Sequence, residues 1–150
     1  MDNDRPPVIG VVGRESGKLR LDVVEHSDQE TLDSFVVKMT KPGATVNTDE
    51  WAGYDRLPKK GRSRVAVCHT PGKREWARDD DGDGVREVHN NTMEGLWTGL
   101  RNFLRPFRGV NKCFLGQYVG MFEWAYNIKA VTMDFLHAIL GIKAITNLGP

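Results

Sequence analysis

The sequence predicts a mixed α/β domain whose C-terminal third is helical. Short β-branched runs in the first half enclose one amphipathic segment, giving the order strand, strand, helix, strand, strand. Apolar residues in the second half recur at helical spacing. The chain of 150 residues is long enough for one domain with a sizeable core, so we expect residues 1–150 to form a single unit.

Composition and charge exclude several classes of protein. A net charge of +1 gives no global argument for nucleic-acid binding, although it can hide local patches. Cys68 and Cys113 lie far apart, so neither a zinc knuckle nor a disulfide scaffold is indicated. The longest apolar tract, 135–145, is interrupted by polar residues and too short to span a bilayer, and no signal-peptide pattern is present. We therefore expect a cytoplasmic protein without a membrane partner.

The first two elements are predicted to form an antiparallel hairpin. Residues 6–14 (PPVIGVVGR) and 18–26 (KLRLDVVEH) are β-branched runs separated by a Glu-Ser-Gly turn signal. Apolar and polar residues alternate in the second run, as in a strand with one covered face. Asp22 is expected on its solvent face.

A helix and two further strands follow. Residues 27–39 have Ser27 or Asp28 as the candidate N-cap and apolar residues at helical spacing, and a Lys-Pro-Gly sequence ends the helix. A short strand then stops at Asp49, and residues 63–70 (SRVAVCHT) make the next strand. We expect the four strands to form one mixed sheet with helices on both faces.

The late helices should supply most of the core. The first begins near Thr92, and residues 114–129 and 132–144 make two more amphipathic helices. The residues expected in the core are Leu96, Trp97, Leu100, Phe103, Phe122 and Trp124.

The first late helix also has a polar edge. At about 100° per residue, Asn91, Glu94, Thr98 and Arg101 fall close together, away from the apolar residues. One interpretation is a capping box with Asn91 as the N-cap and Glu94 at the third helical position. The other is that Glu94 is a second acid that works with Asp49.

Two motifs together resemble the insertion-sequence DDE transposases of the ISXO-two-like group. They are NTDEWAGY (47–54) and HNNTMEGLW (89–97), followed by the basic residue Arg101, and the resemblance covers roughly residues 5–129. It implies an RNase H-like fold in which acidic or amide side chains hold two divalent metal ions, Mg²⁺ or Mn²⁺. Asp49 matches the second catalytic Asp, and Asn91 and Glu94 cover the third position. The implied metal ligands are Asp49 and Glu94.

The metal chemistry explains these residue types. Strand transfer is an in-line displacement at phosphorus, and two metal ions about 3.5–4 Å apart stabilise the attacking and leaving oxygens. The resemblance therefore implies metal-dependent DNA cleavage and strand transfer, with transposon ends and target DNA as partners. The oligomeric state stays open, with a homodimer among the alternatives.

The resemblance also predicts a missing element. The group carries its first catalytic Asp on a first strand inside the sheet, upstream of residues 6–14. Asp2 and Asp4 have no apolar strand around them. We therefore expect a core truncated at its N-terminus, without its first strand and inactive alone. The alternative is a catalytically dead remnant that binds DNA or protein.

Other polar residues allow weaker hypotheses. Six basic residues have two interpretations, contact with DNA phosphates or a merely solvated surface: Lys59, Lys60, Arg101, Arg105, Arg108 and Lys112. Asp79, Asp81 and Asp83 imitate an EF-hand loop, but Asn90 occupies the position of its bidentate Glu, so a solvated acidic loop is favoured. For His69 and His89 one interpretation is a position near the Asp49 pocket, and ordinary polar roles are favoured over it.

The two readings of Glu94 differ in geometry. If Glu94 belongs to a site, its carboxylate and that of Asp49 should approach within a few Å of the separation that two metal ions bridge. An open gap should lie beside Asp49 on the side away from Glu94. A cap gives no reason for such closeness.

Overall fold

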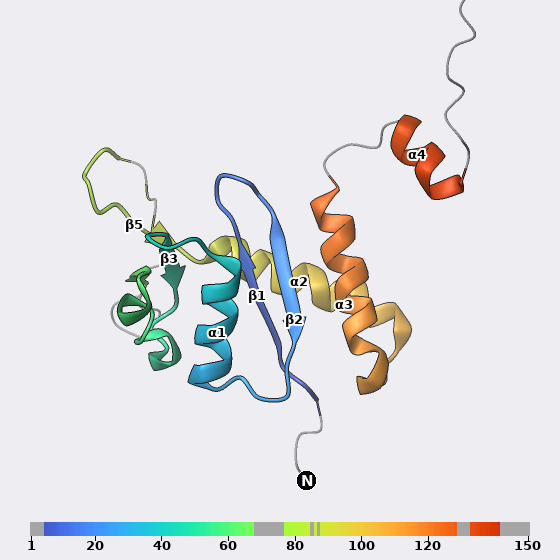
Figure 1. Cartoon of the computed structure of the whole chain (residues 1–150), viewed down its shortest axis with the longest axis horizontal. Coiled ribbons are helices and arrows are strands. Elements are labelled where there is room, and N and C mark those ends of the chain that lie inside the picture. Colours follow the sequence, from blue (N-terminus) through green and yellow to red (C-terminus); the bar gives the residue numbers. More distant parts are fainter. Residues whose placement is uncertain (1–4, 68–76, 85, 87, 129–132, 142–150) are drawn as a thin grey trace, which may run out of the picture.

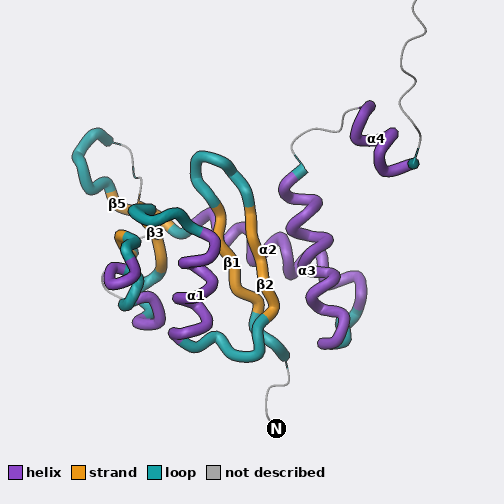
Figure 2. Tube along the Cα trace, in the orientation of Figure 1, coloured by secondary structure: helices purple, strands orange, loops and turns teal. Residues whose placement is uncertain are grey.

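The computed structural model describes residues 5–67, 77–84, 86, 88–128 and 133–141 and confirms a mixed α/β fold (Figure 1). Its strands form three hydrogen-bonded pairs (Figure 2). They are β1 (Val8–Val12) with β2 (Leu19–Val23), antiparallel; β3 (Thr45–Thr48) with β4 (Ser63–Ala66), parallel; and β5 (Ala77–Arg78) with β6 (Val88–His89), antiparallel.

All four predicted strands are present, but the prediction of one four-stranded sheet is wrong for the described residues. No ladder joins β1 to β3, because a cleft separates the two strands. The short pair β5–β6 lies where composition predicts only a loop. The predicted extension of the fourth strand to residue 70 falls outside the described residues.

Helix α1 (Gln29–Met39) covers one face of the hairpin. The N-cap of this helix is Asp28, one of the two predicted candidates. The Asp28 carboxylate accepts a hydrogen bond from the Thr31 amide at 2.8 Å. The helix buries Leu32 and Phe35 against Ile9 of β1. Two short 3-10 helices, η1 (Ala52–Tyr54) and η2 (Pro58–Lys60), connect β3 to β4.

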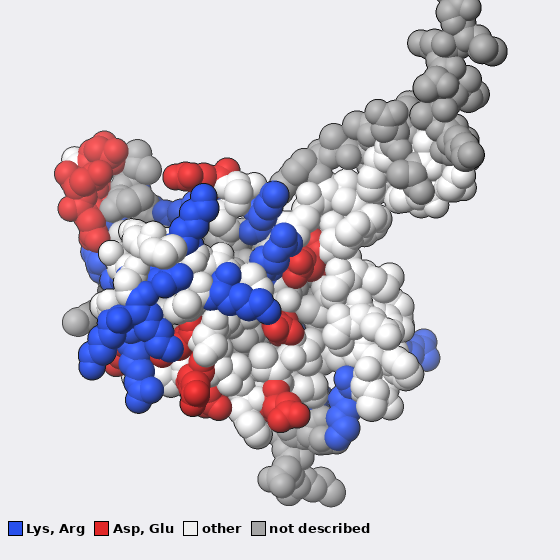
Figure 3. All heavy atoms as spheres, in the orientation of Figure 1, with Lys and Arg blue, Asp and Glu red and all other residues white. Residues whose placement is uncertain are grey.

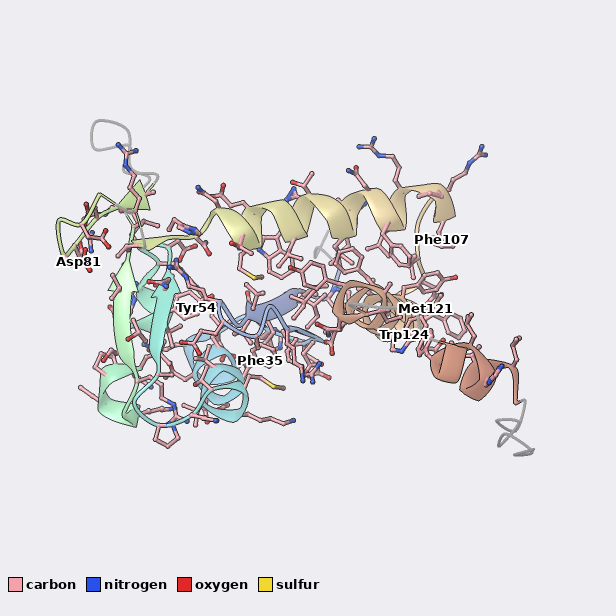
Figure 4. All side chains as sticks on the ribbon, turned by 90° about the horizontal axis from the view of Figure 1, so that it is seen from above. Phe35, Tyr54, Asp81, Phe107, Met121 and Trp124 are labelled. Carbon is pink, nitrogen blue, oxygen red and sulfur yellow. The ribbon has the colours of Figure 1, made fainter. Side chains whose placement is uncertain are left out.

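Helix α2 (Asn91–Leu104) covers the other face. A Cβ added to Gly10 would lie 3.2 Å from the Trp97 ring of α2. Ile9 contacts α1, and consecutive strand residues point to opposite faces. The two helices therefore lie on opposite faces of β1–β2, as predicted and as Figure 4 shows from above.

Helix α3 (Lys112–Asn127), reached through η3 (Arg105–Phe107), closes the outer edge of β2. The Asn127 carboxamide accepts from the Leu19 amide at 2.8 Å and donates to the Leu19 carbonyl at 2.9 Å. The Glu123 carboxylate accepts from the Leu21 amide at 2.6 Å. These side chains take the place of a neighbouring strand. Helix α4 (Met133–Leu140) follows α3 along the chain.

The core differs from the prediction. Leu96 and Leu100 are buried as expected, whereas Trp97, Phe103 and Phe122 are only half-buried. Trp124 is 55% exposed, because it lies on the outer side of α3, where its ring stacks on Phe135 at 6.0 Å. Most buried apolar residues come from the N-terminal half and its loops, and they include Ile9, Leu19, Leu32, Phe35, Val36, Leu57 and Val67. The late helices therefore do not supply most of the core.

Candidate functional site

Asp49 follows β3 directly and is half-buried. Its Oδ1 accepts a hydrogen bond from the Trp51 amide at 3.2 Å, which turns the chain immediately after the strand. A carboxylate has about four acceptor positions, so this bond leaves lone pairs available for a cation. The strand end therefore presents Asp49 as a potential oxygen ligand.

Arg64 of β4 fixes the backbone on both sides of Asp49. Its guanidinium donates to Thr48 Oγ1 at 3.0 Å, to the Asp49 carbonyl at 3.1 Å and to the Trp51 carbonyl at 3.0 Å. It also forms an ion pair with Asp55. The parallel pairing of β3 with β4 places this side chain under the turn. The sequence analysis placed Arg64 only within the predicted strand 63–70 and missed this role.

The charge of Asp49 reaches Tyr54 of η1. Burial raises the pKa of the Tyr54 hydroxyl above its usual 10.0, and the Asp49 carboxylate raises it further, while the Arg64 guanidinium opposes both effects. The Arg64 Cζ atom lies 6.0 Å from the centre of the Tyr54 ring, and the Trp51 ring meets Tyr54 edge-on at 5.9 Å. The motif at 47–54 thus forms one packed turn.

Asp49 and the start of α2 line the same cleft, whose volume is about 1380 Å³. Asn90, Thr92 and Met93 contribute to it from the helix end. Residues of the motifs at 47–54 and 89–97 therefore line one cleft, but the exposed Asn91 and Glu94 are not among its lining residues. The close approach of the Asp49 and Glu94 carboxylates stays a prediction.

The capping-box interpretation of Glu94 is wrong. The N-cap of α2 is Asn90, whose side chain makes no capping hydrogen bond, so Asn91 is the first helical residue and Glu94 the fourth. A capping box needs the acid at the third position. The predicted polar edge is present, because Asn91, Glu94, Thr98 and Arg101 are all exposed.

The predicted DNA-contacting residues are exposed but lie on two separate regions. Lys59 and Lys60 belong to η2, where Figure 3 shows several basic side chains together. The others follow the C-terminal part of α2 and the start of α3, and basic side chains at that end of α2 point away from the molecule in Figure 4. They are Arg101, Arg105, Arg108 and Lys112. Lys60 also forms an ion pair with buried Asp33 at 3.5 Å.

The acidic loop brings three carboxylates together. Oxygens of Asp79, Asp81 and Asp83 lie within 4.8 Å of one another. Asp79 accepts from the amides of Gly82 at 2.6 Å and Gly84 at 2.8 Å, and the Gly84 bond is the main cause of its lowered pKa. These exposed oxygens stabilise the turn itself. Asn90 occupies the N-cap position of α2 without a side-chain capping bond and is not part of this group.

His89 lines the cleft with Asp49, which is the less favoured of the two interpretations of this residue. Its carbonyl accepts a hydrogen bond from Arg14 at 3.1 Å, and the Asn47 side-chain oxygen, once the amide is oriented to suit, accepts from the same guanidinium at 3.2 Å. The buried His89 Nδ1 has no hydrogen-bond partner among the described residues. His69 lies outside those residues.

Comparison with known proteins identifies the family. Residues 2–127 match the model of the ISXO2-like transposase domain. The chain belongs to this family. It is also 26% identical over 121 residues to an uncharacterised protein in the transposable element ISH50 of Halobacterium salinarum, covering 80% of this chain. The chain spans only 38% of the length of that relative. No solved structure matches the chain, and no helix in its described part is long and apolar enough to cross a membrane.

Proposed function

We propose that this member of the ISXO2-like family is the RNase H-like catalytic core of a DDE-type transposase, acting in metal-dependent DNA cleavage and strand transfer. The observation that carries the proposal is the position of Asp49 at the end of β3, inside the cleft that the start of α2 also lines. A carboxylate outside the carboxyl end of a strand is a common location for chemistry in α/β folds. DNA as the substrate implies the cytoplasm as the place of action.

Asp49 and Glu94 are the proposed metal ligands, with Asn91 as the alternative to Glu94. Their hard oxygens suit Mg²⁺ or Mn²⁺, and Mg²⁺ is usually held by one or two carboxylates plus water and phosphate. A bound metal ion would stabilise charge on the reacting phosphate oxygens. Two metal ions require more ligands than these two residues supply. The isolated chain should therefore bind a divalent cation weakly and leave DNA uncut.

The exposed basic residues would hold the DNA backbone. Arg101 lies on the same edge of α2 as Glu94, so a phosphate bound there would be close to the proposed ligand. Arg105, Arg108 and Lys112 extend that surface, and Lys59 and Lys60 make the second one. The alternative function is a catalytically inactive module that binds DNA or protein, either as a monomer or as a homodimer.

A paramagnetic titration tests the metal site. We expect sub-stoichiometric Mn²⁺ to broaden the amide NMR signals of Asp49, Trp51 and Glu94 in the isotope-labelled chain. Asp49→Asn should abolish this broadening, whereas Asp22→Asn, which changes an exposed acid on β2, should preserve it. Broadening confined to residues 79–83 would place the cation in the acidic loop and contradict the proposed site.

DNA assays test the proposed contacts and the expected inactivity. The catalytic core and a DNA-binding module both predict binding of duplex DNA that weakens steeply with salt, because cations are released from the phosphates. Arg101→Gln together with Arg105→Gln should weaken binding several-fold if this surface contacts DNA. The control is Arg20→Gln, which replaces an arginine of β2 that forms an ion pair with Glu123. Nicking by the isolated chain that disappears in Asp49→Ala would refute its expected inactivity. Absence of any DNA binding would count against the catalytic core and against a DNA-binding module, and would favour a protein-binding module.

A further inference from the structure

One exposed basic surface follows the C-terminal part of α2 and its connection to α3. We call it the α2 surface and define it by four exposed residues, Arg101, Arg105, Arg108 and Lys112. No acidic residue occurs between residues 95 and 122, so this segment carries no negative charge of its own. The α2 surface lies on the α2 side of the strands, and in Figure 4 the basic side chains at that end of α2 point away from α1.

The basic region around η2 lies on the other side, because it is attached to α1. The Lys60 ammonium pairs with Asp33 of α1 at 3.5 Å. The Arg62 guanidinium donates to the carbonyls of Val37 and Thr40 at 2.9 and 2.8 Å, at the C-terminal end of α1. Figure 3 shows basic side chains gathered over this part of the molecule. The strands therefore separate the η2 region from the α2 surface.

The basic residues of the η2 region divide into two groups. Lys60 and Arg62 bind α1, and Arg64 holds the turn after β3, so these three cations have structural roles. Arg56 and Lys59 are exposed, and neither forms an ion pair within the described part of the chain. These two side chains are therefore available to an anionic partner.

Lys41 adds a third exposed cation beside them. The Gly43 amide donates to the Gly61 carbonyl at 2.8 Å, which places the turn after α1 next to the end of η2. The neighbouring acid Asp55 forms an ion pair with Arg64, so a cation already balances its charge. We call this group the η2 surface and define it by Lys41, Arg56 and Lys59.

One straight duplex cannot contact both surfaces. The strands and the two helices that cover them lie between the surfaces, and each helix with its side chains is about 10–12 Å across. Duplex DNA has a persistence length of about 150 base pairs, so a short segment resists bending around a body of this thickness. Each surface therefore requires its own segment of DNA.

We propose that one chain holds two separate segments of duplex DNA, one on the α2 surface and one on the η2 surface. Exposed Lys and Arg side chains neutralise phosphates and release their counterions, which gives binding without a specific base sequence. Arg56, Lys59 and Lys41 contact the second segment, whereas the Lys60 ammonium stays with Asp33. The proposal rests on the DNA-binding role in the proposed function and adds a second DNA site to it.

A bead assay with the full chain tests for two DNA sites. One duplex is immobilised through biotin, and a second duplex of unrelated sequence carries a fluorophore, so captured fluorescence reports protein that holds both. Fluorescence anisotropy with a single labelled duplex measures binding of one segment separately. EDTA is present throughout, so metal-dependent chemistry does not enter either measurement.

The wild-type chain should capture the fluorescent duplex. Arg101→Gln with Arg105→Gln and Arg56→Gln with Lys59→Gln should each still bind a single duplex, because the other surface is intact, but should lower capture at least tenfold. Retained binding of one duplex also shows that each variant is folded.

A matched control removes two exposed charges of the hairpin that belong to neither surface. It is Lys18→Gln with Arg20→Gln, and it should leave capture unchanged. Full capture by either surface variant would overturn the proposal, because two copies that each bind DNA through the same surface would then explain the wild-type result. Restored capture in a mixture of the two surface variants would also overturn it, because the two segments would then be held by associated chains.

The two measurements also separate this proposal from the proposed function. A wild-type chain that binds a single duplex but captures no second one would overturn the second DNA site and leave the proposed function standing. A chain that binds no duplex in the anisotropy measurement would overturn the proposed DNA role together with the second site.

Discussion

Replacing Lys60 should destabilise the fold, whereas replacing its neighbour Lys59 should not. Asp33 is fully buried on α1, and its carboxylate oxygens have no hydrogen-bond partner among the described residues. Its ion-pair partner is the Lys60 ammonium at 3.5 Å. Lys60→Gln therefore leaves a buried carboxylate without a nearby positive charge, while Lys59→Gln changes an exposed cation of the same 3-10 helix.

The ion-pair geometry sets the magnitude. At 3.5 Å, an effective dielectric constant of about 20 gives an attraction of roughly 5 kcal/mol. The Lys60 side chain is 39% exposed, so solvent screens part of this attraction. Because breaking a buried pair leaves its partner uncompensated, we expect Lys60→Gln to lower the free energy of unfolding by about 2–3 kcal/mol. The corresponding fall in Tm is about 6–9 °C.

Urea unfolding of a double-mutant cycle checks this estimate. In an Asp33→Asn background the buried charge is absent, so adding Lys60→Gln should change the unfolding free energy by less than about 0.5 kcal/mol. Arg62 donates to the Lys60 backbone carbonyl, and the substitution does not remove that bond. Equal stabilities of Lys60→Gln and Lys59→Gln, or the same cost of Lys60→Gln in both backgrounds, would refute the ion-pair reasoning.

Two further predictions concern β2 and Tyr54. Asn127→Ala removes the acceptor of the buried Leu19 amide and one of the two donors to the Leu19 carbonyl, which also accepts from Arg20, and should cost about 2 kcal/mol in urea unfolding. Asn127→Asp keeps the acceptor but sets a second carboxylate oxygen against the Leu19 carbonyl, so full stability of Asn127→Asp would contradict the two-sided bond. Because the pKa of Tyr54 is raised in the folded state, its contribution to stability is complete below pH 10 and is lost as pH rises through the folded pKa. Tyr54→Phe should flatten this alkaline decline, and Asp49→Asn should lower the Tyr54 pKa in a phenolate absorbance titration; an unchanged pKa would show that the Asp49 charge does not reach the ring.

Local chemistry made the elements predictable. β-branched runs located β1 to β4, and helical spacing located α1, with its N-cap Asp28 as one of two candidates. The motifs that carry the family resemblance also lie where expected, at the end of β3 and the start of α2. Each of these inferences depends on residues close together in the sequence.

Long-range packing was not predictable in the same way. Trp124 has the spacing of a core residue, but α3 uses Glu123 and Asn127 to bind the edge of β2 and leaves the Trp124 ring on its outer side. A polar pair facing a strand edge has no signature in hydrophobic periodicity. The cleft between β1 and β3 was not predictable either, because the pairing of two strands depends on backbone direction and not on residue type alone.

In the turn after β3, part of the sequence motif stabilises the backbone and does not act at the proposed site. Read as sequence, residues 47–54 look like a row of functional side chains, yet most of their polar atoms stabilise the turn. Thr48 Oγ1 and the carbonyls of Asp49 and Trp51 accept from Arg64, and the Trp51 amide donates to Asp49 Oδ1. These bonds fix the backbone while leaving the Asp49 carboxylate with further lone pairs at the cleft. The position of the Asp49 carboxylate therefore depends on Arg64 of the neighbouring strand, a residue that lies outside the motif.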